Sequence, residues 1–201
     1  MRFISIGRAC NVKHQIDKHI GKSETLFFDW LITDIASVIK LLRCTSIEDI
    51  LNIDSIKVDP DRPIVDSNSR ILITSLPKCI SIHDIPVNSS EKDIIEFIDK
   101  YKRRYQRIID IINSNENVFF IRHGHVDNES KQLFIQTIQD INKNCNFTLV
   151  IVKANQSIDT INRNINILEI NVTTKPHLID DWTTDWMDWK LIFNTIHEGI
   201  I

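Results

Sequence analysis

Apolar residues recur along the chain with two different periods, which predict strands and helices in alternation. Residues 147–153 form a nearly continuous apolar run, as is typical of a strand buried on both faces of a parallel sheet. Within residues 91–113, apolar side chains recur alternately every four and every three positions, which predicts one face of a long helix. This stripe consists of Ile94, Ile98, Tyr101, Tyr105, Ile108 and Ile112. The same patterns predict strands over 2–6, 70–74, 79–83, 117–122 and 165–171, and helices over 9–20, 129–142 and 180–197. A further helix, with Thr33 or Asp34 as its cap, is predicted to run to about Leu42.

The order of these elements predicts the fold class. Strands and helices alternate through the second half of the chain, which favours an α/β fold with a central, largely parallel or mixed sheet flanked by helices. Residues 57–69 contain two prolines and no apolar period, so we expect a loop there. Trp182, Trp186 and Trp189 are spaced by four and three, which predicts a C-terminal helix that packs on the core. From the length of 201 residues we expect a single domain covering residues 1–201.

Composition and charge exclude several classes of partner. Isoleucine supplies 39 of the 201 residues, so it also occupies solvent-facing positions and blurs the apolar pattern. The formal net charge of -3 gives no electrostatic reason to expect nucleic acid or an anionic membrane as partner. The sequence contains no apolar stretch of about 20 residues, and its N-terminal apolar run is too short for a signal peptide. We therefore expect a cytoplasmic protein with no nucleic-acid and no membrane partner.

Cysteine is the residue type that first suggests chemistry. The four cysteines, Cys10, Cys44, Cys79 and Cys145, are widely spaced and form no C-x-x-C pair, so we expect free thiols, no metal site and no cofactor. Only Cys10 follows a predicted strand and a glycine and stands where a helix begins. The amide groups and dipole of a helix N-terminus lower the pKa of a thiol, and α/β folds place their sites at this edge of the sheet. Cys10 is the candidate nucleophile, and its alternative role is that of a small buried apolar residue.

Three further residues are candidates to assist such a thiol. His83 ends a predicted strand, where its imidazole can act as a general base. Asp84 orients that imidazole only if the strand ends there, because neighbouring strand residues point to opposite faces. Asp29 lies inside the apolar segment 24–32, and a buried acid must be paired or hydrogen-bonded. Asp29 is therefore either structural or the third member of the site, and the choice between Asp84 and Asp29 stays open.

A second motif suggests different chemistry. Arg122, His123 and Gly124 close a predicted strand and look like the signature of the histidine phosphatases, in which a histidine after the first strand accepts a phosphoryl group. That signature belongs near the N-terminus, ahead of a large domain, whereas here it lies in the second half of the chain. A phosphatase also needs a second histidine, such as His177, facing His123. We expect instead that Arg122 anchors a loop or holds an acid or an anion.

Several motifs together resemble a known family. The family is one of papain-like cysteine peptidases of unknown function, and the resemblance covers nearly the whole chain. The residues that carry it are Gly7-Arg8-Ala9-Cys10, Phe28-Asp29-Trp30, the His83-Asp84 pair, the arginine-bearing segments 103–107 and 118–122, and the acidic tryptophan-containing tail 185–189. The resemblance implies Cys10 as nucleophile, His83 as base and Asp84 or Asp29 as third member. Papain-like folds set a helical half against a β half, whereas the order of strands and helices here predicts an α/β fold.

Two hypotheses from different classes follow. In the first, the protein is a cysteine-dependent hydrolase or acyltransferase that acts on a peptide, acyl or glycan-linked substrate. Trp30, Arg122 and His123 are then the expected substrate-binding residues, and the N–H groups of residues 8–11 hold the oxyanion. In the second, the protein is a non-catalytic binding module on an α/β scaffold. The distance from Cys10 Sγ to the nearest imidazole discriminates between them, because a general base must lie within hydrogen-bond or one-water reach.

Overall fold

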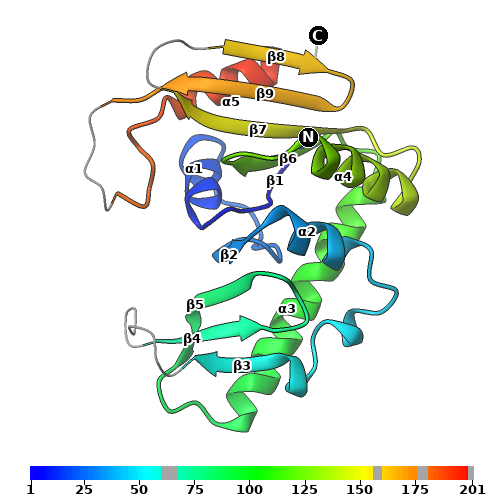
Figure 1. Ribbon diagram of the computed structural model, residues 1–201, viewed down its shortest axis with the longest axis vertical. Helices are drawn as coiled ribbons and strands as arrows, with labels where there is room; N and C mark the ends of the chain where they lie inside the picture. Colours follow the sequence, from blue (N-terminus) through cyan, green and yellow to red (C-terminus); the bar gives the residue numbers. More distant parts are fainter. Residues whose placement is uncertain (60–67, 156–159, 176–180, 199–201) are drawn as a thin grey trace.

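A five-stranded mixed sheet, sheet A, forms the upper half of the molecule (Figure 1). The computed structural model describes residues 1–59, 68–155, 160–175 and 181–198. The order of strands in sheet A is β1 (Arg2–Ser5), β6 (Val118–His123), β7 (Phe147–Asn155), β9 (Ile167–Thr173) and β8 (Thr160–Asn164). The first four are parallel, and β8 pairs antiparallel to β9. The predicted α/β class with a mixed sheet and flanking helices is thereby confirmed.

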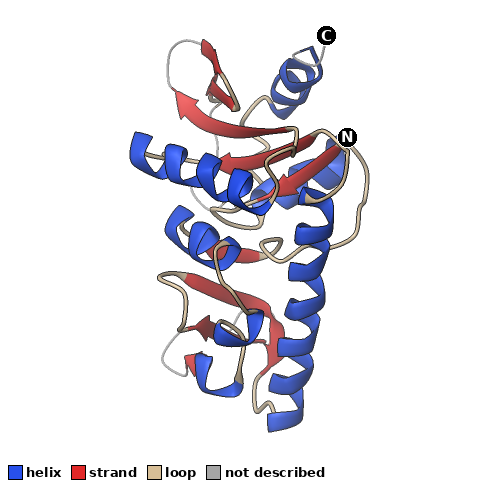
Figure 2. Cartoon of the chain, turned by 90° about the vertical axis from the view of Figure 1, so that its right-hand side faces the viewer, coloured by secondary structure: helices blue, strands red, loops and turns tan. Residues whose placement is uncertain are grey.

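Helices cover both faces of sheet A, and each face has its own buried apolar cluster. On one face, α1 (Asn11–His19) and α5 (Trp189–Glu198) pack on side chains of β6, β7 and β9. The other cluster contains side chains of α2 (Ile35–Leu42), α3 (Glu91–Ile112) and α4 (Asn128–Ile141), and it continues into a second sheet. The long helix α3 runs beside both sheets (Figure 2). Among the described helices, none is long and apolar enough to cross a membrane.

The second sheet, sheet B, is antiparallel and was not predicted as a separate layer. Its order is β2 (Leu31–Thr33), β5 (Cys79–Pro86), β4 (Asn68–Ile73) and β3 (Ile56–Asp59). The predicted loop over 57–69 is wrong at both ends, because β3 occupies its start and β4 its end, while residues 60–67 lie outside the described part. The middle residues of β3 are exposed, so the strand owes its existence to pairing with β4 rather than to an apolar period.

Hydrogen bonds at the first residues of α2 and α3 explain why these two helices were predicted correctly. Asp34 accepts a hydrogen bond from the Ser37 amide at the start of α2, and Ser90 forms a capping box with Asp93 at the start of α3. The long helix ends at Ile112 with Asn113 as its C-cap, as the apolar stripe predicts.

The C-terminal helix is shorter than predicted. It begins at Trp189, and the residues described before it, 181–188, form turns and an isolated β-bridge. Trp189 is buried and its indole N–H donates to the Thr184 carbonyl at 3.1 Å, whereas Trp182 is 56% exposed. The three tryptophans therefore do not lie on one apolar helix face, and only Trp189 belongs to the helix.

Candidate active site

The turn between β1 and α1 carries Cys10 and is hydrogen-bonded to both sheets. Gly7 has a φ of +89°, a left-handed conformation that favours glycine, and a Cβ there would overlap Thr33 Oγ1. The Thr33 amide donates to the Arg8 carbonyl at 3.0 Å, so the turn runs beside β2 of sheet B. The chain then enters α1, with Cys10 at its N-cap position. Cys10 therefore stands at the carboxyl edge of sheet A, where the two sheets meet.

Arg122 at the end of β6 fixes this junction. Its guanidinium donates from Nη1 to the Ile6 carbonyl at 2.7 Å and from Nη2 to the Thr33 carbonyl at 3.2 Å. The side chain is buried, and burial lowers the pKa of Arg122 to about 10 although Asp34 opposes the shift. Arg122 was predicted as a substrate-binding residue or as a loop anchor, and its two bonds join the backbone just after β1 to the last residue of β2.

His83 approaches Cys10 from sheet B. The pairing of Leu31 with Ser81 and of Thr33 with Cys79 places β5 beside β2, and β2 is the strand that the Cys10 turn runs along. As a result, His83 Nε2 lies 4.0 Å from Cys10 Sγ. His83 is exposed, whereas Cys10 is 9% exposed. This distance is within the reach that the enzyme hypothesis requires.

The pKa of the Cys10 thiol is shifted in the direction opposite to the prediction. Burial raises it above its ordinary value, and a hydrogen bond from the backbone opposes this only partly. The helix N-terminus does not outweigh the loss of hydration, because a charged sulfur in a nearly buried position loses most of its contact with water. Cys10 is therefore a neutral thiol at rest, and it needs a base to become nucleophilic.

Asp84 points away from the His83 ring and binds α3. Its carboxylate accepts hydrogen bonds from Lys100 Nζ and Tyr101 Oη, each at 2.6 Å, and from the Ser81 hydroxyl. Although burial disfavours its charge, the hydrogen bonds from Lys100, Ser81 and Tyr101 hold the pKa of Asp84 below its ordinary value. Among the described residues, no carboxylate forms a hydrogen bond or ion pair with His83. Asp84 thus fixes the strand on which His83 stands.

Asp29 is buried beneath α1. It accepts a hydrogen bond from the Leu26 amide at 2.8 Å, and Lys13 Nζ lies 3.7 Å from the same oxygen. Burial raises the pKa of Asp29 to about 6, and the charge of Lys13 opposes this shift. The next residue, Trp30, is half-buried with a φ of +65°, a strained conformation for a bulky side chain, and it directly precedes the Leu31–Ser81 pair. Asp29 and Trp30 therefore shape the entry into β2.

His123 lies at the same sheet edge, but on the side of α1. Its Nδ1 is 2.8 Å from the side-chain amide of Asn11, the residue that follows Cys10. Burial, with the charges of Arg8 and Arg122, lowers the pKa of His123 to about 4. The ring is neutral near pH 7. The second histidine required for a phosphatase, His177, lies outside the described residues.

Residues 1–157 match a protein family described as "putative papain-like cysteine peptidase". The chain belongs to this family. Both Cys10 and His83 lie within the matched range. A relative with 25% identity, an uncharacterised protein R408 of Acanthamoeba polyphaga mimivirus, aligns over 94% of this chain and 96% of its own length. No solved structure matches the chain significantly.

The family description agrees with a cysteine hydrolase, and the α/β architecture places Cys10 at the carboxyl edge of sheet A. Cys10 follows the first parallel strand and begins the first helix, a position in which α/β folds place functional side chains. In the described part of the chain, no three histidine, cysteine or acidic side chains gather as a metal-binding group.

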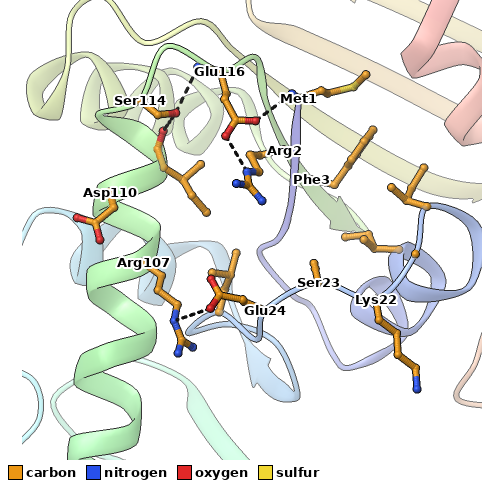
Figure 3. Close-up of a pocket in the computed structure, with 15 residues that line it drawn as sticks. Met1, Arg2, Phe3, Lys22, Ser23, Glu24, Arg107, Asp110, Ser114 and Glu116 are labelled. Atoms are coloured by element: carbon orange, nitrogen blue, oxygen red, sulfur yellow. Dashed lines mark hydrogen bonds and ion pairs between the residues drawn. The ribbon is translucent and has the colours of Figure 1, made fainter.

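A cavity of about 470 Å³ lies at the other end of β1 (Figure 3). Its lining comes from the start of β1, the loop after α1 and the C-terminal half of α3, and it includes Phe3, Glu24 and Arg107. Cys10 and His83 are not among the lining residues. His83, which approaches the thiol from sheet B, is exposed to solvent.

Sequence reasoning missed two residues that surround Cys10. Asn11 was not singled out, although its amide contacts His123, and Arg8 was considered only as part of a motif. The available signal was position alone, since both residues flank the cysteine in a strand–turn–helix junction. Contacts of this kind depend on where β6 ends, which the local pattern around Cys10 does not encode.

Proposed function

We propose that the protein is a cysteine-dependent hydrolase or acyltransferase in which Cys10 is the nucleophile and His83 the base. The observation that carries the proposal is the 4.0 Å separation of Cys10 Sγ and His83 Nε2. The thiol sulfur attacks a carbonyl carbon as His83 takes the thiol proton. The tetrahedral intermediate then expels its leaving group, which receives that proton, and water or another acceptor releases the acyl group from sulfur.

Burial of Cys10 sets the order of proton transfer. Because the pKa of the thiol is raised, the proton moves to His83 as the substrate binds and reacts rather than beforehand. The amide groups of the first turn of α1 have no intrahelical partner, and His14 is the first residue whose N–H bonds back, to the Cys10 carbonyl at 3.0 Å. These free amides, with the helix dipole, are the proposed oxyanion donors.

We assign Asp84 and Asp29 positioning roles in this mechanism. Asp84 holds β5 against α3 through Lys100 and Tyr101 and thereby fixes the distance between His83 and Cys10. Asp29 is linked to α1 through Lys13, the third residue after Cys10. The proposed catalytic group is thus a Cys–His dyad, in which Asp84 positions the histidine and Asp29 positions the helix that follows the cysteine. Trp30 and His123 are proposed to contact substrate on either side of it.

The test is the rate of alkylation by iodoacetamide at neutral pH, followed for each cysteine by peptide mass spectrometry. We expect Cys10 to react faster than Cys44, Cys79 and Cys145. Replacement His83→Gln should slow Cys10 by about a hundred-fold, the lower end of what a positioned general base contributes.

The matched control is His19→Gln, which removes an exposed imidazole at the end of α1 and should leave the rate at Cys10 unchanged. Equal reactivity of all four thiols, or a His83→Gln rate equal to that of the unsubstituted protein, would contradict the proposed dyad. In that case the binding-module hypothesis would take its place.

A further inference from the structure

Arg8, which has no counter-ion among the described residues, lies two residues before the proposed nucleophile. Arg8 is exposed and, in the part of the chain that the structure describes, its guanidinium forms neither a hydrogen bond nor an ion pair. Its side chain lies across the end of β6, because Arg8 Cδ and Nη1 are 3.7 and 3.8 Å from where a Cβ on Gly124 would stand. The side chain is therefore folded along the carboxyl edge of sheet A instead of extending into solvent.

The surroundings of Arg8 are electropositive and rich in donors. Arg122 is buried at the end of β6, and the positive charge of Arg8 is one of the influences that lower the pKa of Arg122. His123 stays neutral, and with the Asn11 amide as donor to Nδ1 at 2.8 Å the ring proton is on Nε2, where it is available to a ligand. A guanidinium and an imidazole N–H thus lie near one another at this edge, a set of donors that suits an anionic oxygen pair.

Arg8 is also close to Cys10 along the chain. Two Cα–Cα steps of about 3.8 Å keep the two Cα atoms within about 8 Å of one another. His83 approaches the thiol from sheet B, whereas Arg8 extends over sheet A, so the two side chains flank Cys10 on different sides. A substrate that reacts at Cys10 and lies along the sheet edge brings its next few atoms to Arg8.

We propose that Arg8 binds a carboxylate of the substrate next to the carbonyl that Cys10 attacks, which makes the protein selective for acidic acyl or peptide substrates. The inference rests on the proposed role of Cys10. The carboxylate can be the terminal carboxylate of a peptide or the side chain of an aspartate or glutamate, and both present the same planar pair of oxygens to the guanidinium.

The experiment compares three alkylating probes of similar size. N-bromoacetylglycine carries a terminal carboxylate, the α-amide of N-bromoacetylaspartate carries only a side-chain carboxylate, and N-bromoacetylglycinamide is neutral. In each reaction the Cys10 sulfur forms a bond to the methylene carbon, bromide leaves, and the thiol proton passes to His83. The measured quantity is the rate of each acidic probe at Cys10 divided by the rate of the neutral probe.

We expect Arg8→Gln to lower this ratio by about five-fold for at least one acidic probe, the factor for about 1 kcal/mol of charge attraction near 4 Å in water. The acidic probe with the higher ratio identifies the source of the carboxylate. Arg43→Gln is the matched control, since it removes an exposed arginine at the C-cap of α2 and should leave both ratios unchanged.

Two outcomes overturn the inference and one supports it. Fast reaction of Cys10 with the neutral probe, combined with ratios that Arg8→Gln does not change, rejects the Arg8 subsite and leaves the dyad standing. An equal fall in the rate ratio in Arg8→Gln and Arg43→Gln also rejects the Arg8 subsite, because the effect is then one of net charge. A loss confined to Arg8→Gln supports it. Failure of the proposed function is separate, because Cys10 then reacts slowly with the neutral probe as well.

Discussion

Gly7 controls the position of the proposed nucleophile, and replacing it by alanine tests this directly. Its φ of +89° is a conformation that costs an L-residue about 1–2 kcal/mol. The new methyl group would also overlap Thr33 Oγ1 and stand 3.2 Å from Arg122 Nη1. Thr33 is held by backbone hydrogen bonds and cannot retreat freely, so we add about 1–3 kcal/mol for overpacking. Gly7→Ala should therefore destabilise the protein by about 2–5 kcal/mol.

A double-mutant cycle separates the two contributions. Thr33 Oγ1 is buried without a hydrogen-bond partner among the described residues, so Thr33→Ala alone should cost only about 1 kcal/mol. In the double variant the steric part disappears and the conformational part remains, which gives a favourable coupling energy of about 1–3 kcal/mol. Urea denaturation of the four proteins measures these values, and Cys10 alkylation by iodoacetamide should slow in Gly7→Ala and recover in the double variant.

Simple additivity of the two substitutions would refute the argument. It would mean that the Gly7 backbone can shift away from β2 without cost. The turn would then not be the element that holds Cys10 against sheet B.

The remaining predictions concern the two buried carboxylates. Asp84→Asn should slow alkylation of Cys10 several-fold while leaving the thiol itself intact, because β5 loses its charged contact with α3. The control Asp99→Asn, at an exposed position on that helix, should have no effect on the rate of Cys10 alkylation. A change in both variants alike would contradict this role. Asp29 has a pKa raised to about 6, so the folded state binds its proton more tightly than the unfolded state and stability falls as pH rises from about 4 to about 6. Between pH 4.5 and 7.5, the stability of Asp29→Asn in urea denaturation should therefore rise by about 2 kcal/mol relative to that of the unsubstituted protein. A difference in stability that stays constant with pH would exclude the raised pKa.

The success of the sequence predictions depended on whether the decisive forces were local. Helix α3 was predicted well because its apolar stripe and its Ser90 cap lie within the segment itself. Strand β8 was missed because all five of its residues, Thr160–Asn164, are exposed, and only pairing with β9 defines it. Sheet B was predicted in pieces for the same reason, since the alignment of β2 with β5 joins residues that are far apart in the sequence.

The same distinction explains the candidate site. The position of Cys10 could be predicted, because a strand, a glycine and a helix start are consecutive in the sequence. The approach of His83 depends on the β2–β5 register and on the Arg122 hydrogen bonds, which no short pattern contains. The thiol pKa was predicted with the wrong sign because it is a balance: a helix terminus contributes a modest local field, whereas burial removes most of the hydration of a thiolate.

This balance also determines what the scaffold must supply. A thiol whose pKa is already lowered would react wherever a substrate reached it, and the position of the histidine would matter little. In the proposed mechanism Cys10 is protonated at rest, so its reactivity depends on the 4.0 Å distance to His83, and this distance is set by elements of two different sheets. Any substitution that moves sheet B relative to the Gly7 turn should therefore affect Cys10 reactivity more than it affects the stability of sheet A.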